Sequence, residues 1–304
     1  MSIKTVALIG GTGTLGRPLL QALQSSPFTL KVLNRASSKS TYPNTSVITV
    51  PDDLNVAEVT TLFKDHAIDA VVIAFEGHHV EAAKRLVEAA FNAGVKRVIP
   101  PDFGSCDSAD AKTNEILPLM KGKKGVRDYM VEMAAKEREG GVGRLTWTTL
   151  ITGHFFDYGL TCGLLNFNVE KRKAYLLDGG DVKFSNSTLP FIADAVIRIL
   201  QKPEETANKV LYIHSLRFTQ NELLAVLEKV TGESFEKVEQ SSEEELGRSR
   251  PKMLEGSQEA EEEVVAVWGI VATDWLGREG FANELLGLEE ENLEEEVRKA
   301  LGKL

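Results

Sequence analysis

Residues 1–100 alternate between short apolar runs and amphipathic helical patterns, and this alternation restricts the fold more than any other feature. Strand-like runs cover 5–10, 28–34, 47–51, 69–75 and 95–100, and helical spacing covers 15–26, 56–66 and 80–94. Since a helix and short connections separate consecutive strands, we expect the strands to run parallel, with helices on both faces of the sheet. The segment 69–75 is almost wholly apolar, as a strand buried on both faces requires. The pattern predicts a doubly wound α/β fold.

The later part of the chain predicts a second, smaller lobe. After a polar loop at 101–118 come a helix at 119–139 closed by Gly140 and Gly141, and a strand at 145–153. We expect a β-hairpin at 173–185 that turns at Gly179–Gly180, a helix at 190–201, a strand at 208–215 and mainly helices after 219. Residues 1–153, joined by 186–215, are expected to form the first domain. Residues 154–185 and 216–304 are expected to form an α+β substrate-binding lobe.

A glycine cluster, GGTGTLG, joins the first predicted strand to the first predicted helix. Gly11, Gly13 and Gly16 fit the pattern GxGxxG, and Gly10 starts an overlapping GxxGxxG. Such glycines allow a tight turn and a close approach to a pyrophosphate, which then lies at the helix N-terminus. No Gly-Lys-Ser/Thr follows, which argues against a P-loop. The predicted fold is therefore an NAD(P)-binding Rossmann domain, whose cofactor-binding turn comprises Gly10, Gly11, Thr12, Gly13, Thr14, Leu15 and Gly16.

The end of the second predicted strand favours NADPH over NADH. An NAD site places an acidic residue there for the ribose hydroxyl, whereas this chain has Arg35, which suits a 2′-phosphate. Ser37 and Ser38 follow and are expected to help bind the phosphate. Asp52 follows the third strand, where it could reach the adenine edge or simply cap the next helix.

The residues that would perform chemistry are less obvious. Short-chain reductases usually use a Tyr-x-x-x-Lys pair, but none of the five tyrosines has a lysine four positions later. The segment KGKKGVR opens the helix after the fifth strand, where ligands bind on open α/β sheets. A partly desolvated lysine there could move a proton at neutral pH, although solvated lysines at a helix start are an equally natural interpretation.

The chain resembles the NmrA-like and isoflavone reductase-like proteins, an atypical group of short-chain dehydrogenases/reductases. ALIGGTGTLG, VLNR and AAFNAGVKRVIPPDFG are similar to family motifs, and WTTLITGHFFDYGL resembles fungal members in particular. The segment KKGVR resembles the family's Lys-x-x-x-Arg, which implies that Lys123 is the general base or proton relay, with Lys124 as the alternative. Pro101, Gly153 and Ala83 depart from the plant members, so the plant lignan and isoflavonoid substrates are not carried over.

The resemblance also extends the expected site beyond the lysine. His154 could be a second proton donor, or only a packed loop histidine. Phe155 matches a family phenylalanine near the nicotinamide. Phe75 and Phe103 complete the residues that we expect to contact the cofactor, together with Lys123.

Composition narrows the class of protein. The net charge is −10 with no basic stripe, which argues against a nucleic-acid partner. No apolar run approaches the roughly 20 residues of a membrane span, and no secretory pattern precedes the glycine cluster. Two cysteines, Cys106 and Cys162, with no metal-ligand spacing, indicate free thiols and no metal site. We therefore expect a cytoplasmic monomer or homodimer that acts on a small molecule.

These features together predict an NADPH-dependent oxidoreductase. It would transfer hydride from nicotinamide to a small aromatic or polyketide-like secondary metabolite, with Lys123 handling the proton. Two alternatives remain open. One is a non-catalytic NADP(H)-binding sensor of the NmrA-like type. The other is a redox-neutral isomerase, cyclase or epoxide-opening enzyme that uses the same cleft.

Overall fold

The computed structural model describes residues 2–138 and 143–302, which divide into two compact units. The first unit comprises 1–103, 119–150 and 192–211, and the second comprises 104–118, 151–191 and 212–304. The chain thus enters each unit more than once. This division does not test the predicted domain boundaries at 153 and at 186–215, which stay a prediction.

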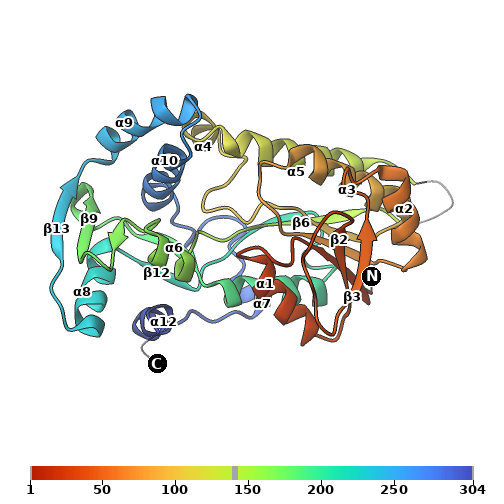
Figure 1. Cartoon of the computed structure of the whole chain (residues 1–304), viewed down its shortest axis with the longest axis horizontal. Coiled ribbons are helices and arrows are strands. Elements are labelled where there is room, and N and C mark those ends of the chain that lie inside the picture. The colour runs from red at the N-terminus through yellow and green to blue at the C-terminus, as the bar shows by residue number, and fades with distance from the viewer. Residues whose placement is uncertain (1, 139–142, 303–304) are drawn as a thin grey trace. The chain divides into compact units, whose positions relative to one another are not determined.

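The first unit is built on a seven-stranded sheet of order β11-β6-β5-β4-β1-β2-β3 (Figure 1). Its strands are β1 (Thr5–Ile9), β2 (Thr29–Arg35), β3 (Ser46–Val50), β4 (Ala70–Ile73), β5 (Arg97–Ile99), β6 (Thr146–Ile151) and β11 (Lys209–Tyr212). Strands β1 to β6 pair in parallel. The chain moves outward from β1 to β3 and then resumes at β4 on the other side of β1. The carboxyl ends of β1 and β4 therefore flank the point where an open sheet of this kind binds its ligand. The predicted Rossmann fold is confirmed.

Helices cover both faces of this sheet (Figure 1). They are α1 (Gly16–Gln24), α2 (Val56–Asp65), α3 (Val80–Ala93), α5 (Leu119–Ala135) and α7 (Leu189–Gln201). One apolar core joins α2, α3 and α5 to the sheet, and its fully buried members include Val71, Leu86 and Met130. Local signals set the helix ends: the Asn55 side chain accepts two backbone N–H bonds at the start of α2, and Gly94 ends α3 in a left-handed conformation. Helix α5 ends earlier than the predicted residue 139, and Gly140 and Gly141 lie outside the described residues.

The second unit contains two three-stranded sheets and shorter helices. The sheets are β12-β10-β7 and β13-β9-β8. The strands are β7 (His154–Phe155), β8 (Phe167–Asn168), β9 (Lys173–Leu177), β10 (Phe184–Ser187), β12 (Leu216–Phe218) and β13 (Glu236–Gln240). The helices are α4 (Ala111–Ile116), α6 (Phe156–Cys162), α8 (Gln220–Thr231), α9 (Ser242–Leu254), α10 (Gln258–Val271), α11 (Asn283–Leu286) and α12 (Leu293–Ala300). Helix α4 interrupts the loop predicted at 101–118.

The hairpin predicted at 173–185 is wrong. Gly179 and Gly180 do form a turn, both with positive φ, but the strands on either side enter different sheets. Strand β9 pairs in parallel with β13, with Lys173 opposite Glu236, whereas β10 pairs with β12 and β7. A Gly-Gly pair specifies a turn locally. However, β9 pairs antiparallel with β8, which precedes it, and its other partner β13 lies about sixty residues further along the chain.

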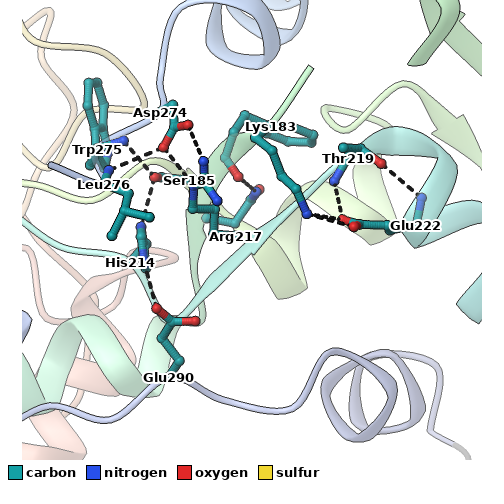
Figure 2. A network of polar contacts seen from close by, with 12 residues as sticks. Lys183, Ser185, His214, Arg217, Thr219, Glu222, Asp274, Trp275, Leu276 and Glu290 are labelled. Carbon is teal, nitrogen blue, oxygen red and sulfur yellow. Dashed lines mark hydrogen bonds and ion pairs between the residues drawn. The ribbon is translucent and has the colours of Figure 1, made fainter. Parts of the chain in front are cut away.

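A network of polar contacts holds the β12-β10 region of the second unit (Figure 2). Ser185 Oγ lies 2.9 Å from His214 Nδ1, and His214 Nε2 lies 3.1 Å from Glu290 Oε1. The backbone N–H of Trp275 donates to Ser185 Oγ at 3.0 Å. Since the Glu290 carboxylate only accepts, the neutral imidazole carries its proton on Nε2, and Nδ1 accepts from the Ser185 hydroxyl. Ser185 and His214 are fully buried. The network therefore satisfies buried polar atoms rather than presenting a nucleophile to solvent.

Candidate functional site

The glycine turn after β1 is built so tightly that two of its glycines exclude any side chain. Gly10 has a φ of +87°, and a β-carbon there would lie 2.5 Å from the carbonyl oxygen of Ala74. A β-carbon on Gly16 would lie 1.9 Å from the carbonyl oxygen of Gly10. The turn is closed by a hydrogen bond from the backbone N–H of Gly13 to the same oxygen at 3.0 Å. The first helix therefore starts directly against the end of the first strand.

The N-terminus of α1 is open to an anion. Within the described chain, no side chain caps this end at Leu15, and the first turn contains no acidic residue. The Arg17 side chain donates to the Thr12 carbonyl at 3.0 Å and so stiffens the turn. Unpaired N–H groups and the positive end of the helix dipole favour a phosphate here. This terminus fits the pyrophosphate of a dinucleotide.

A pocket of about 190 Å³ lies beside the turn, at the carboxyl ends of β1 and β2. Six predicted cofactor residues line it: Gly10, Thr12, Arg35, Ser38, Asp52 and Phe75. Eight further lining residues were not predicted from the sequence: Ile9, Leu33, Asn34, Ser40, Tyr42, Leu54, His79 and Ala82. The pocket has mixed polar and apolar walls, which suits the adenosine end of a dinucleotide.

Asp52 and Ser37 bind each other at the rim of this pocket. Asp52 Oδ1 accepts the backbone N–H of Ser37 at 3.0 Å and its hydroxyl at 2.6 Å. These bonds, with a smaller contribution from the nearby Arg35, lower the pKa of Asp52, so its carboxylate stays ionised. Ser37 is thus committed to Asp52, while Ser38 lines the pocket itself. Arg35 is exposed at the end of β2 and is one of the residues that line the pocket.

Two of the lining residues that were not predicted, Leu54 and His79, have distinctive geometry that the sequence hardly indicates. Leu54 is buried with a φ of +53°, a conformation that is uncommon for a bulky residue and tends to persist at functional sites. His79 lies edge-on to Phe75, with ring centroids 5.6 Å apart, just before α3. Nothing in the local sequence predicts a left-handed leucine. His78 and His79 stand just before α3 in the sequence, and their position alone does not distinguish a binding role from the start of a helix.

Lys123 lies against the loop that follows β4. A β-carbon on Gly77 would lie 2.7 Å from Lys123 Cε and 3.0 Å from its Cγ, so the aliphatic stem runs across this glycine. A β-carbon on Gly122 would meet Val80 at 2.9 Å, which shows how closely the first turn of α5 packs on this loop. Lys124 instead forms a 2.5 Å ion pair with Asp128 and is 41% exposed. Of the two lysines, only Lys123 has its stem packed at the carboxyl edge of the sheet.

A buried ion pair anchors the same turn of α5. Arg127 Nε donates to Asp102 Oδ2 at 2.8 Å, and the two side chains are 6% and 2% exposed. Arg127 lies one turn after Lys123, and Asp102 lies in the segment after β5. Charges this deep are stable only when paired, so the pair fixes the rotation of α5 and with it the direction of Lys123.

Three further predicted residues, Phe103, His154 and Phe155, are not among the residues that line this pocket. Phe103 is buried at the end of the first unit's initial segment. His154 and Phe155 form β7 in the second unit, and His154 Nε2 stands 2.0 Å from where a β-carbon of Gly269 would be. Burial lowers the pKa of His154 to about 4, so this imidazole is neutral at physiological pH. Its proposed catalytic role is untested and stays a prediction.

Gly153 has a structural reason to be glycine. Its φ is +69°, and a β-carbon there would lie 2.1 Å from the carbonyl oxygen of Ser185. A larger residue would collide with β10 in this backbone. The departure from the plant pattern is therefore built into the packing of the second unit.

Comparison with known proteins places the chain in a family. The model of the NmrA-like family matches residues 2–138. The oxidoreductase aprR of Aspergillus flavus is 32% identical over 99% of both chains. The chain belongs to the NmrA-like family. A bifunctional pinoresinol-lariciresinol reductase of Forsythia intermedia is 28% identical to this NmrA-like protein and covers 80% of it, with 81% of its own length matched.

Solved structures share the fold of this NmrA-like protein along its whole length. AtPrR2 with NADP+ and (+)-pinoresinol has a TM-score of 0.79 at 21% identity, covering 99% of both chains. The binary complex of leucoanthocyanidin reductase with NADPH from Vitis vinifera has a TM-score of 0.80 at 18% identity, covering 98% of this chain and 100% of the other. None of the described helices is long and apolar enough to cross a membrane.

Proposed function

We propose that this NmrA-like protein is an NADPH-dependent reductase of a small aromatic or polyketide-like metabolite, with Lys123 as the proton relay or general base. The observation that carries the proposal is the order of three neighbouring strands, β4-β1-β2. Their carboxyl ends place Lys123, the glycine turn and Arg35 along one edge of the sheet. A dinucleotide bound at the turn would therefore have Arg35 toward one end and Lys123 toward the other.

The residues of the first unit divide the work of binding. The open N-terminus of α1 holds the pyrophosphate, and Arg35 pairs with the 2′-phosphate as a planar guanidinium does with phosphate oxygens. Leu54 and Phe75 give the adenosine pocket its apolar walls. The ionised Asp52 beside Arg35 repels a phosphate, and its hydrogen bonds to Ser37 draw part of that charge away. The arginine therefore carries the preference for NADPH.

Bound NADPH supplies a hydride from its nicotinamide ring. Lys123 Nζ would carry the proton that, together with the hydride, completes the reduction of the substrate. The packing of the lysine stem on Gly77 limits where Nζ can move. The Arg127–Asp102 pair keeps α5 from rotating, so the lysine is oriented before any substrate binds. The relatives named above as reductases and oxidoreductases support this assignment.

The test is to titrate the purified protein with NADPH and NADH, and then to screen quinones, enones and aromatic carbonyls for NADPH oxidation. We expect tighter binding of NADPH, loss of that preference in Arg35→Ala, and turnover that Lys123→Ala abolishes and Lys124→Ala retains. Full turnover in both lysine variants would refute the role of the lysine. Product formation without NADPH oxidation would identify a redox-neutral enzyme, and equal affinity for both oxidation states without turnover would identify a sensor.

A further inference from the structure

The segment Ser38–Tyr42, which follows β2, leans against the glycine turn. A β-carbon on Gly11 would lie 3.1 Å from Tyr42 Cε1, so the edge of the tyrosine ring rests directly on this glycine. Ser40 Oγ lies 3.5 Å from Thr12 Oγ1, and Asn34 Nδ2 donates to the Ser40 carbonyl at 3.4 Å. The segment therefore bridges the end of the second strand and the turn after the first.

This segment also forms one wall of the adenosine pocket. Ser38, Ser40 and Tyr42 line it together with Leu54 and other apolar residues. A ligand in the pocket is therefore in reach of the tyrosine ring.

The segment is bonded through its backbone at the two ends and only weakly between them. The Ser38 N–H donates to the Arg35 carbonyl at 2.9 Å, and the Tyr42 carbonyl accepts from the Thr45 N–H at 3.3 Å. The contacts of Ser40 to its neighbours, at 3.4 and 3.5 Å, lie at the upper limit for hydrogen bonds. Residues 38–42 belong to no helix or strand. Few buried contacts and a non-regular backbone mean that local opening costs little free energy. The segment can therefore open to admit a ligand and close again.

We propose that Ser38–Tyr42 is a clasp that closes over the adenosine end of the cofactor, and that the Tyr42 ring sets the affinity for that end. The ligand's identity rests on the proposed function. Because Gly11 has no side chain, the Tyr42 ring can pack directly on its backbone. Gly10 and Gly16 are required for a different reason, since a side chain on either would collide with neighbouring backbone atoms. A ring in this position excludes water from the nucleoside and contacts it directly, as aromatic side chains do with bases.

The probe is 2′,5′-ADP, which carries the adenosine end of NADPH without the nicotinamide. By isothermal titration, Tyr42→Ala should raise the Kd for 2′,5′-ADP at least 5-fold and the Kd for NADPH by the same factor. Tyr42→Phe should stay within 2-fold, because the ring edge rather than the hydroxyl rests on Gly11. The neighbouring Thr41→Ala is the matched control and should also stay within 2-fold.

Closure of the clasp over the ligand can be measured by limited proteolysis. Lys39 is exposed within the clasp, so trypsin should cleave after it in the free protein and at least 5-fold more slowly with saturating 2′,5′-ADP. Equal cleavage rates, an unchanged Kd in Tyr42→Ala, or an equal loss in Tyr42→Phe would overturn the clasp. Failure of the unaltered protein to bind either 2′,5′-ADP or NADPH would overturn the proposed function together with it.

Discussion

Removing the guanidinium of Arg127 should destabilise the protein far more than removing a neighbouring cation. The Arg127→Met variant leaves the Asp102 carboxylate, only 2% exposed, without its ion-pair partner. Breaking such a pair costs about 3–5 kcal/mol, a large part of the roughly 5–15 kcal/mol that stabilises a typical domain. The matched control is Lys124→Met on the same helix, whose pair with Asp128 is 41% and 61% exposed. An exposed pair contributes less than about 1 kcal/mol.

The assay is urea unfolding followed by circular dichroism and by tryptophan fluorescence, whose transitions must coincide for a two-state fit. The double variant Asp102→Leu/Arg127→Met should recover most of the lost stability, because apolar side chains can replace a buried pair at little cost. Raising the salt concentration should shrink the effect of Lys124→Met and leave that of Arg127→Met unchanged. Equal costs for the two single variants would refute the inference that burial makes the Arg127 pair the anchor of α5.

Three further outcomes are expected. Gly77→Ala should displace the flexible Lys123 stem and lower kcat by about 10²-fold with a stability change below about 1 kcal/mol. Gly125→Ala, on the helix that carries Lys123 and with open space around it, should leave kcat unchanged. Gly10→Ala should abolish NADPH binding in a fluorescence titration and destabilise the protein, since its β-carbon would strike the Ala74 carbonyl. Burial lowers the pKa of His154 to about 4, whereas the unfolded chain takes up this proton near pH 6.5, so the free energy of unfolding should fall by up to about 3 kcal/mol as the pH drops from about 6.5 toward 4. His154→Gln should flatten that pH dependence in urea unfolding.

Local signals made much of the first unit predictable. The turn of Gly10–Gly16, the position of Arg35 at the end of β2 and the cap at Gly94 each depend on a few adjacent residues, and the structure contains all three. The choice between Lys123 and Lys124 was not predictable, because it depends on the rotation of α5. That rotation is set by Asp102, which lies 25 residues before Arg127.

The rest of the pocket escaped prediction for a related reason. Tyr42 and Ser40 lie in a polar loop with no periodicity, and their contacts to Gly11 and Thr12 bring together residues about thirty positions apart. The hairpin predicted at Gly179–Gly180 failed in the same way, since β9 pairs with β8 before it and with the distant β13, and not with β10 after the turn. Sequence patterns thus specify turns and strand order, while the walls of a pocket depend on which distant loops meet.

The loop Ala74–His79 connects the two halves of the candidate site. The carbonyl of Ala74 fixes the conformation of Gly10, and Phe75 and His79 line the adenosine pocket. Gly77, in the same loop, carries the stem of Lys123. Because β4 lies beside β1, one short loop touches both the nucleotide pocket and the proposed proton relay. A variant of this loop is therefore interpretable only when the Kd for 2′,5′-ADP is measured beside kcat: a change in kcat alone assigns the effect to the lysine, and a change in both assigns it to the glycine turn.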